Sequence, residues 1–168
     1  FPLLQAMWKI APALALGNTV VLKPASVTPL TSLLFANLLA EAGLPPGAFN
    51  VVPGPGAAVG AAMAEHPGID KISFTGETET GKSILRAAAG TLKRVSMELG
   101  GKSPNVVFAD ADLDAAARGA INAIFYGKGE LCSAGSRLLV EESIHDALIE
   151  KVAERARKMA PADPLDPK

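Results

Sequence analysis

The regular alternation of short β-rich runs with amphipathic helical stretches is the feature that most constrains the fold. Runs rich in β-branched and apolar residues lie at 18–23, 49–52, 71–74, 94–99, 105–108 and 137–140. Helical patterns lie at 28–43, 78–89, 112–125 and 143–156, and a further helix is expected to end near residue 66. Strands that alternate with helices form parallel sheets covered by helices. The sequence therefore predicts an α/β fold with a doubly wound, mostly parallel sheet.

Three of the expected helices begin with capping signals. Thr28 supplies a hydroxyl before Pro29, which suits the first helical position. Asp112 precedes the apolar positions of the next helix, and Ser143 with Asp146 matches a capping box. We expect these side chains to bind the free amides at the helix starts.

Charge and composition exclude several classes of function. The 168 residues carry a formal net charge of −1 and scattered Lys and Arg, so no basic stripe indicates nucleic-acid binding. The longest apolar runs, such as residues 10–16, are too short to cross a bilayer, and no signal peptide is recognised. A single cysteine rules out an internal disulfide and favours a reducing, cytoplasmic setting.

The single cysteine, Cys132, stands in the segment YGKGELCSAGSR, directly after the helix expected at 112–125. Glycines at 127, 129 and 135 allow tight turns and a close approach of a ligand to the backbone. A lone cysteine is often a buried core residue, but such residues usually lie within a periodic apolar face. The alternative is a catalytic nucleophile, which must be partly ionised. The local sequence leaves both interpretations open.

Glu98 ends an apolar strand and is followed by Leu99 and two glycines, in RVSMELGGKSP. It is either a strand-end carboxylate in water or a partly desolvated general base. Ligands collect at the carboxyl ends of strands in open α/β sheets, which favours the second interpretation. The strand–helix pattern restarts after Gly100 and Gly101, where we expect a domain junction.

Two further segments suggest a dinucleotide site. In FTGETETG, glycines at 76 and 81 flank an expected helix start, where backbone amides can bind phosphate, although the usual dinucleotide fingerprint is absent. Lys23 ends the first strand in VLKPAS and either reaches a ligand or extends its ammonium into water. His66 and His145 lack metal-ligand spacing, so no metal site is expected.

Together these segments resemble the aldehyde dehydrogenase superfamily. The matching stretches are FPLLQAMWKIAPALALGNTVVLKPA, EAGLPPGAFNVVPG, ISFTGETETG, MELGGKSPNVVFADADLD and GELCSAGSR. They have the family's order and spacing and cover nearly the whole chain. The resemblance implies oxidation of a small-molecule aldehyde to a carboxylic acid with NAD or NADP.

The resemblance also implies residue roles. Cys132 attacks the aldehyde to give a thiohemiacetal and then a thioester, its backbone N–H forms part of the oxyanion hole, and Glu98 activates the water that releases the acid. Cofactor-binding positions are Lys23, Ser26, Gly56, Gly60, Phe74, Gly76, Glu77 and Leu99. Substrate-tunnel positions are Gln5, Trp8, Leu131 and Ser133. Residues 1–100 would belong to a Rossmann-like dinucleotide-binding domain, and residues 101–168 would begin the catalytic domain.

The chain departs from the common family pattern at several positions. Ser26 stands where a Glu often repels a 2′-phosphate, so NADP is expected to be accepted as well as NAD. Glu77 replaces a frequent Ser and weakens the expected pyrophosphate contact, and the usual G-Q-x-C reads Gly-Glu-Leu-Cys at 129–132.

The resemblance also indicates that family segments lie beyond both ends. The family's Trp-Asn pair would precede Phe1, and its Glu-x-Phe-Gly-Pro segment would follow Lys168. We therefore expect the chain to be an internal fragment, inactive alone, of an enzyme that forms homo-oligomers. Two alternatives remain: a non-catalytic dinucleotide-binding fragment, and a CoA-acylating semialdehyde dehydrogenase, against which Glu98 argues.

Overall fold

A computed structural model describes residues 1–159, 162–163 and 165. The chain divides into two compact units, Phe1–Leu99 and Gly100–Lys168, which are described separately. Within the described residues, no helix is long and apolar enough to cross a membrane.

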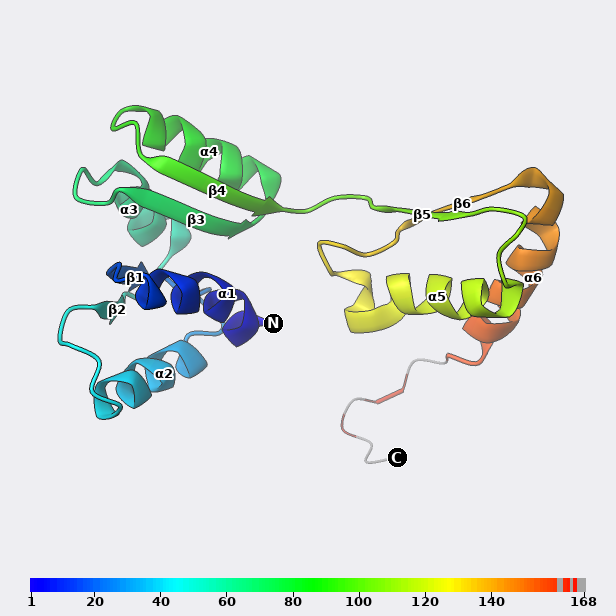
Figure 1. The fold of residues 1–168 in the computed structure, drawn as a ribbon, viewed down its shortest axis with the longest axis horizontal. Coiled ribbons are helices and arrows are strands. Elements are labelled where there is room, and N and C mark those ends of the chain that lie inside the picture. Colours follow the sequence, from blue (N-terminus) through cyan, green and yellow to red (C-terminus); the bar gives the residue numbers. More distant parts are fainter. Residues whose placement is uncertain (160–161, 164, 166–168) are drawn as a thin grey trace. The chain divides into compact units, whose positions relative to one another are not determined.

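The first unit contains two parallel strand pairs and the helices that connect them (Figure 1). β1 pairs with β2, and β3 pairs with β4. Its elements, in order, are α1 (Pro2–Ala15), β1 (Val20–Leu22), α2 (Leu30–Glu41), β2 (Phe49–Val51), the π-helical turn η1 (Gly56–Gly60), α3 (Ala61–Glu65), β3 (Lys71–Gly76), α4 (Thr78–Ala89) and β4 (Arg94–Leu99).

The expected α/β class with parallel strands is confirmed, but two local predictions need correction. The sequence interpretation assigned no helix to the start of the chain, where α1 forms around Pro12. Thr28 was expected to cap α2, yet Pro29 occupies the cap position and no side chain binds the free amides there. The Thr28 amide instead donates to the Ala25 carbonyl at 3.1 Å, so this residue belongs to the preceding turn.

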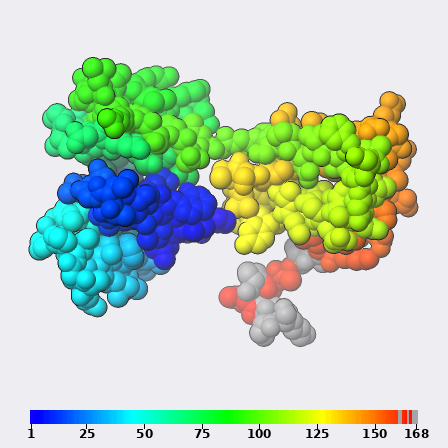
Figure 2. Space-filling view, in the orientation of Figure 1, coloured from blue at the N-terminus to red at the C-terminus, as the bar shows by residue number. Residues whose placement is uncertain are grey.

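Small side chains allow close packing in the first unit. Ala6 and Ile10 lie one helical turn apart on α1 and are buried, and Ala64 and Ala88 are buried on α3 and α4. The Phe35 and Phe49 rings meet edge to face at 6.0 Å, joining α2 to β2. α2 is drawn in light blue in Figure 2, and its Leu30, Leu34 and Leu38 side chains are exposed.

A buried lysine joins α3 to the start of β4. Lys93 is 8% exposed, and its Nζ donates to the His66 carbonyl at 2.6 Å and to the Met63 carbonyl at 3.4 Å. These carbonyls belong to the end of α3, where a helix lacks internal donors. Lys93 thus satisfies that helix end with a positive charge.

The second unit is one further strand–helix–strand motif followed by a helix. β5 pairs with β6 in parallel, and α5 packs against α6. Its elements are β5 (Pro104–Val107), α5 (Leu113–Phe125), the short turn η2 (Tyr126–Gly129), β6 (Arg137–Val140), the short turn η3 (Glu142–Ile144) and α6 (His145–Arg157). The core centres on Val107, Ala117 and Leu148.

The capping predictions in this unit had different outcomes. Asp112 caps α5 as expected, because its Oδ1 accepts from the amides of Asp114 at 2.9 Å and Ala115 at 3.1 Å. The capping box at Ser143 and Asp146 is wrong. Ser143 Oγ donates to Glu141 Oε1 at 3.0 Å, and α6 begins without a side-chain cap. A 3₁₀ turn at the start of α6 places Ser143 before the position that a capping hydroxyl needs.

Candidate active site

The carboxyl ends of β3 and β4 bring together residues that the sequence interpretation assigned to one site. Parallel register places Thr75 opposite Glu98, and Gly76 opposite Leu99. Leu99 is partly buried, and a methyl group placed on Gly81 of α4 would lie 2.9 Å from its Cδ2. The end of β4 is therefore packed against the first turn of α4, which places Glu98 at the same edge.

Glu98 is less enclosed than the sequence interpretation expected. Its side chain is exposed, whereas the general-base interpretation called for partial desolvation. Side chains alternate between the two faces of a strand. Met97 and Leu99 are partly buried and Glu98 is not, so the first unit supplies no apolar cover at this position.

Gly76, the last residue of β3, is covered by a side chain of its own strand. The Phe74 ring lies over Gly76, because a methyl group on Gly76 would meet Phe74 Cζ at 2.5 Å. The approach of a phosphate to the backbone at Gly76 and Gly81 stays a prediction. Glu77 is exposed and occupies the cap position of α4 without a side-chain cap bond. A carboxylate at this helix start opposes a second anion, so Glu77 acts against a pyrophosphate there.

A polar network that the sequence interpretation missed connects α1 with β3. Lys9 Nζ donates to Thr75 Oγ1 at 2.8 Å and to the Gln5 carbonyl at 3.3 Å. Thr75 Oγ1 in turn donates to Gln5 Oε1 at 3.4 Å. Gln5, a predicted tunnel residue, is thus held against the strand neighbour of Glu98. The sequence signal was a lysine within the apolar run around residue 9, but its partner lies 66 residues away.

Trp8, on the same helix, is 60% exposed. Gln5 and Trp8 therefore lie on α1, but the network reaches only Gln5. Their assignment to a substrate tunnel stays a prediction.

The predicted ribose-binding residues Lys23 and Ser26 converge on one backbone carbonyl. Lys23 Nζ and Ser26 Oγ each donate to the Gly54 carbonyl at 3.2 Å, and Lys23 also donates to the Pro24 carbonyl at 2.7 Å. A methyl group on Gly60 would lie 3.7 Å from Lys23 Cδ, so the lysine stem runs along this glycine. The structure brings these residues together and adds Gly54, which the sequence interpretation did not single out.

Gly56 is exposed at the start of η1, and a methyl group there would meet no atom within 4 Å. Gly56 and Gly60 bound the same turn, which leaves an open backbone surface beside Lys23. The adenine contact that the resemblance implies at these glycines stays a prediction.

Cys132 lies in a tight turn at the surface of the second unit. The Ala134 amide donates to the Leu131 carbonyl at 3.0 Å, which places Cys132 and Ser133 at the centre of the turn, where both are exposed. Ala134 is buried and anchors the turn. A methyl group on Gly101 would lie 3.9 Å from the Cys132 carbonyl oxygen, so the turn borders the segment that follows β4.

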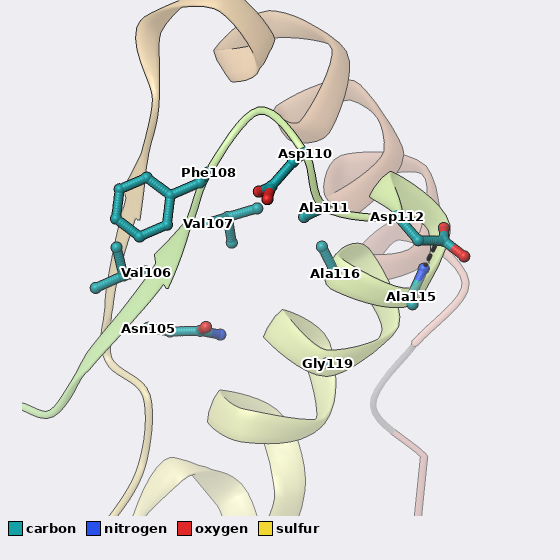
Figure 3. A pocket seen from close by; sticks show the side chains of 10 residues that line it. All are labelled: Asn105, Val106, Val107, Phe108, Asp110, Ala111, Asp112, Ala115, Ala116 and Gly119. Carbon is teal, nitrogen blue, oxygen red and sulfur yellow. Dashed lines mark hydrogen bonds between the residues drawn. The ribbon is translucent and has the colours of Figure 1, made fainter.

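A separate hollow of about 420 Å³ lies in the second unit between β5 and α5 (Figure 3). Apolar side chains such as Val106 and Phe108 contribute to it, together with the carboxylates of Asp110 and Asp112. The Asp112 carboxylate is occupied by its capping bonds. The predicted site residues do not line this hollow.

Comparison with known proteins decides the family. The model of the family described as "Aldehyde dehydrogenase family" matches residues 1–168. The chain belongs to the aldehyde dehydrogenase family. This confirms the resemblance read from the sequence motifs.

Two curated relatives show how closely the family sequences agree. Betaine aldehyde dehydrogenase of Bacillus subtilis is 55% identical over 159 residues, which cover 95% of this chain and 32% of the relative. Retinal dehydrogenase 2 of Homo sapiens is 55% identical over 168 residues, which cover 99% of this chain and 32% of the relative. This aldehyde dehydrogenase chain thus spans about a third of the length of these relatives.

Solved structures agree with the fold. HpcC from Thermus thermophilus matches with a TM-score of 0.93 and 55% identity, over 99% of this chain and 32% of that chain. Betaine aldehyde dehydrogenase from Staphylococcus aureus, solved in complex with NAD⁺, matches with a TM-score of 0.94 and 44% identity, over 99% of this chain and 34% of that chain.

Proposed function

We propose that the protein oxidises an aldehyde to a carboxylic acid with NAD or NADP, through Cys132 as nucleophile and Glu98 as general base. The observation that carries the proposal is the family match over all 168 residues, which includes both side chains and the segments around them. The exposed position of Cys132 in a tight turn supports it, because a nucleophile must be accessible to its substrate.

In the first half of the proposed reaction the Cys132 sulfur adds to the aldehyde carbonyl. A C–S bond forms and the carbonyl π-electrons move to oxygen, giving a thiohemiacetal. The hydrogen bond that closes the turn around Cys132 comes from the Ala134 amide and does not involve the Cys132 amide. We assign the Cys132 amide as a hydrogen-bond donor to the developing oxyanion. The oxidised nicotinamide, when bound, supplies the hydride acceptor.

Loss of hydride restores the C=O bond and leaves a thioester on Cys132. Glu98 then removes a proton from water, the water oxygen attacks the thioester, and the C–S bond breaks to release the acid. Water reaches the exposed Glu98 carboxylate directly, and the partial desolvation expected of a general base is not supplied by the first unit.

The residues at the carboxyl ends of the strands fit a dinucleotide. Lys23 and Ser26 supply polar atoms suited to a ribose, and the Lys23 stem runs along Gly60. Leu99 and Gly76 lie opposite each other at the ends of β4 and β3, where we place the nicotinamide half. Homo-oligomer formation and a cytoplasmic location stay predictions.

The test separates the two chemical roles in the longer enzyme that we expect to contain this chain. Glu98→Gln should accumulate a thioester that intact-mass spectrometry detects, and turnover should fall about 10²-fold or more, as expected for a general base. Cys132→Ala should form no covalent adduct and produce no acid while still binding cofactor. Glu154→Gln, an exposed carboxylate on α6, is the matched control and should keep normal turnover. Steady turnover by Glu98→Gln without a trapped thioester, or near-normal oxidation by Cys132→Ala, would contradict the proposal.

A further inference from the structure

The turn η2, which leads from α5 towards Cys132, contains a strained lysine. Gly127, Lys128 and Gly129 all have positive φ, at +58°, +64° and +73°. Glycine adopts such values at little cost, and at Gly129 a methyl group would meet the Ile124 carbonyl oxygen at 2.9 Å. Of these three residues, only Lys128 carries a side chain, and L-residues are disfavoured in the left-handed region.

An ion pair accompanies this strained conformation. Lys128 Nζ lies 3.0 Å from Glu130 Oε2, and both side chains are exposed. The Glu130 amide also donates to the Gly127 carbonyl at 3.3 Å, so the backbone and the two side chains close the same short loop. The cost of a left-handed lysine and the gain from an exposed ion pair are both small, so the pair offsets part of the strain.

The loop ends directly before the proposed nucleophile. A methyl group on Gly127 would lie 3.7 Å from Leu131 Cδ2, so the Leu131 side chain packs beside Gly127. The Leu131 carbonyl accepts the hydrogen bond from the Ala134 amide that closes the turn around Cys132. A change in the backbone path of residues 127–130 therefore displaces Leu131, and with it the turn that carries Cys132.

We infer that Lys128 and Glu130 are positioning residues, whose ion pair offsets the left-handed strain of Lys128 and thereby fixes the orientation of the Cys132 turn. This inference rests on the proposed function. Both residues act through the backbone at Leu131 and leave the chemistry to Cys132. Because an exposed ion pair contributes little free energy, loss of this pair should slow the attack by Cys132 about two- to fivefold.

Two replacements of Lys128 separate strain from charge in the longer enzyme that contains this chain. The rate of cofactor reduction in a single turnover reports the attack by Cys132 and the hydride transfer. Lys128→Met removes the ion pair and keeps a side chain at positive φ, so this rate should fall about two- to fivefold while the KM of the cofactor stays unchanged. Lys128→Gly removes the same charge but relieves the strain, so it should retain the wild-type rate.

Amide exchange of residues 127–135 provides a readout besides activity. It should be faster in Lys128→Met than in wild type, and unchanged in Lys128→Gly. Lys158→Met is the matched control, because Lys158 is an exposed lysine that pairs with Glu154 at 2.7 Å on α6, and it should alter neither measurement.

Exchange of the two charges completes the test. Lys128→Glu combined with Glu130→Lys restores an ion pair of opposite direction, so the double variant should recover the rate that Lys128→Met loses. An unchanged rate in Lys128→Met, equal losses in Lys128→Met and Lys128→Gly, or a slow charge-swapped enzyme overturns this inference alone. A wild-type longer enzyme that binds cofactor but forms no acid from aldehydes overturns the proposed function as well.

Discussion

Replacement of Lys93 by methionine tests whether a buried ammonium holds the end of α3. Methionine keeps an unbranched stem and fills the same space, but it has no donor for the His66 and Met63 carbonyls. The 2.6 Å bond to His66 is charge-assisted, and such bonds stabilise by about 1.5–3 kcal/mol, whereas the 3.4 Å contact with Met63 adds little.

Part of that loss is offset in the variant, because folding no longer has to remove from water the charge of a side chain that is only 8% exposed. We therefore expect a net loss of about 1–2 kcal/mol in the local free energy of opening. This corresponds to roughly five- to thirtyfold faster amide exchange in α3.

Hydrogen–deuterium exchange read by mass spectrometry measures this effect in α3 peptides. Lys82→Met is the matched control, because Lys82 lies on the surface of α4 and forms an ion pair with exposed Glu79. Loss of this pair should change the free energy of opening by less than about 0.5 kcal/mol. The effect at Lys93 should also persist at high salt, which screens only exposed charges. Unchanged α3 exchange in Lys93→Met would refute the argument that this ammonium holds the helix end.

Two further predictions concern the second unit. The hydrogen bond from Lys151 at 2.8 Å, and then its charge, hold the pKa of Asp114 below the ordinary value of 3.8, so this contact stabilises the folded state above that pH and is lost as pH falls through the folded pKa. Asp114→Asn should flatten the acid side of a stability–pH curve measured by urea unfolding, and an equally steep loss in both proteins would count against the contact. Leu148→Ala, at a fully buried position, should lower the free energy of unfolding measured with urea by about 2–5 kcal/mol. Leu30→Ala, at a position 77% exposed, should lower it by less than about 1 kcal/mol. Equal losses in the two variants would disprove the assigned core.

Much of the fold could be predicted because its signals are local. The bounds of α4, β4 and β6 follow from apolar periodicity and from the residues that end each element. Asp112 was recognisable as a cap because its partners are the amides two and three residues away. α1 was missed because Pro12 interrupts its pattern, although the structure accommodates this proline inside the helix.

The same distinction between local and long-range signals applies to the candidate site. Cys132 and Glu98 received their predicted roles from the resemblance of their motifs to the family, because the local sequence alone left other interpretations open. These roles stay predictions. The exposure of the two side chains was not predictable, because it depends on which distant segments cover a strand end. The contacts of Lys9 with Thr75 were missed for the same reason, since the partners are 66 residues apart.

The sequence by itself determined the alternation of strands and helices, the family, and the identity of the proposed nucleophile and base, because each depends on residues close together in the chain. Only the tertiary structure decided which acceptor receives the hydrogen bonds of Lys23 and Ser26. Their shared acceptor, Gly54, lies 31 and 28 residues away, and no local pattern records it. Parallel pairing of β1 with β2 places that carbonyl beside them, so the polarity of the proposed ribose site is a property of the fold.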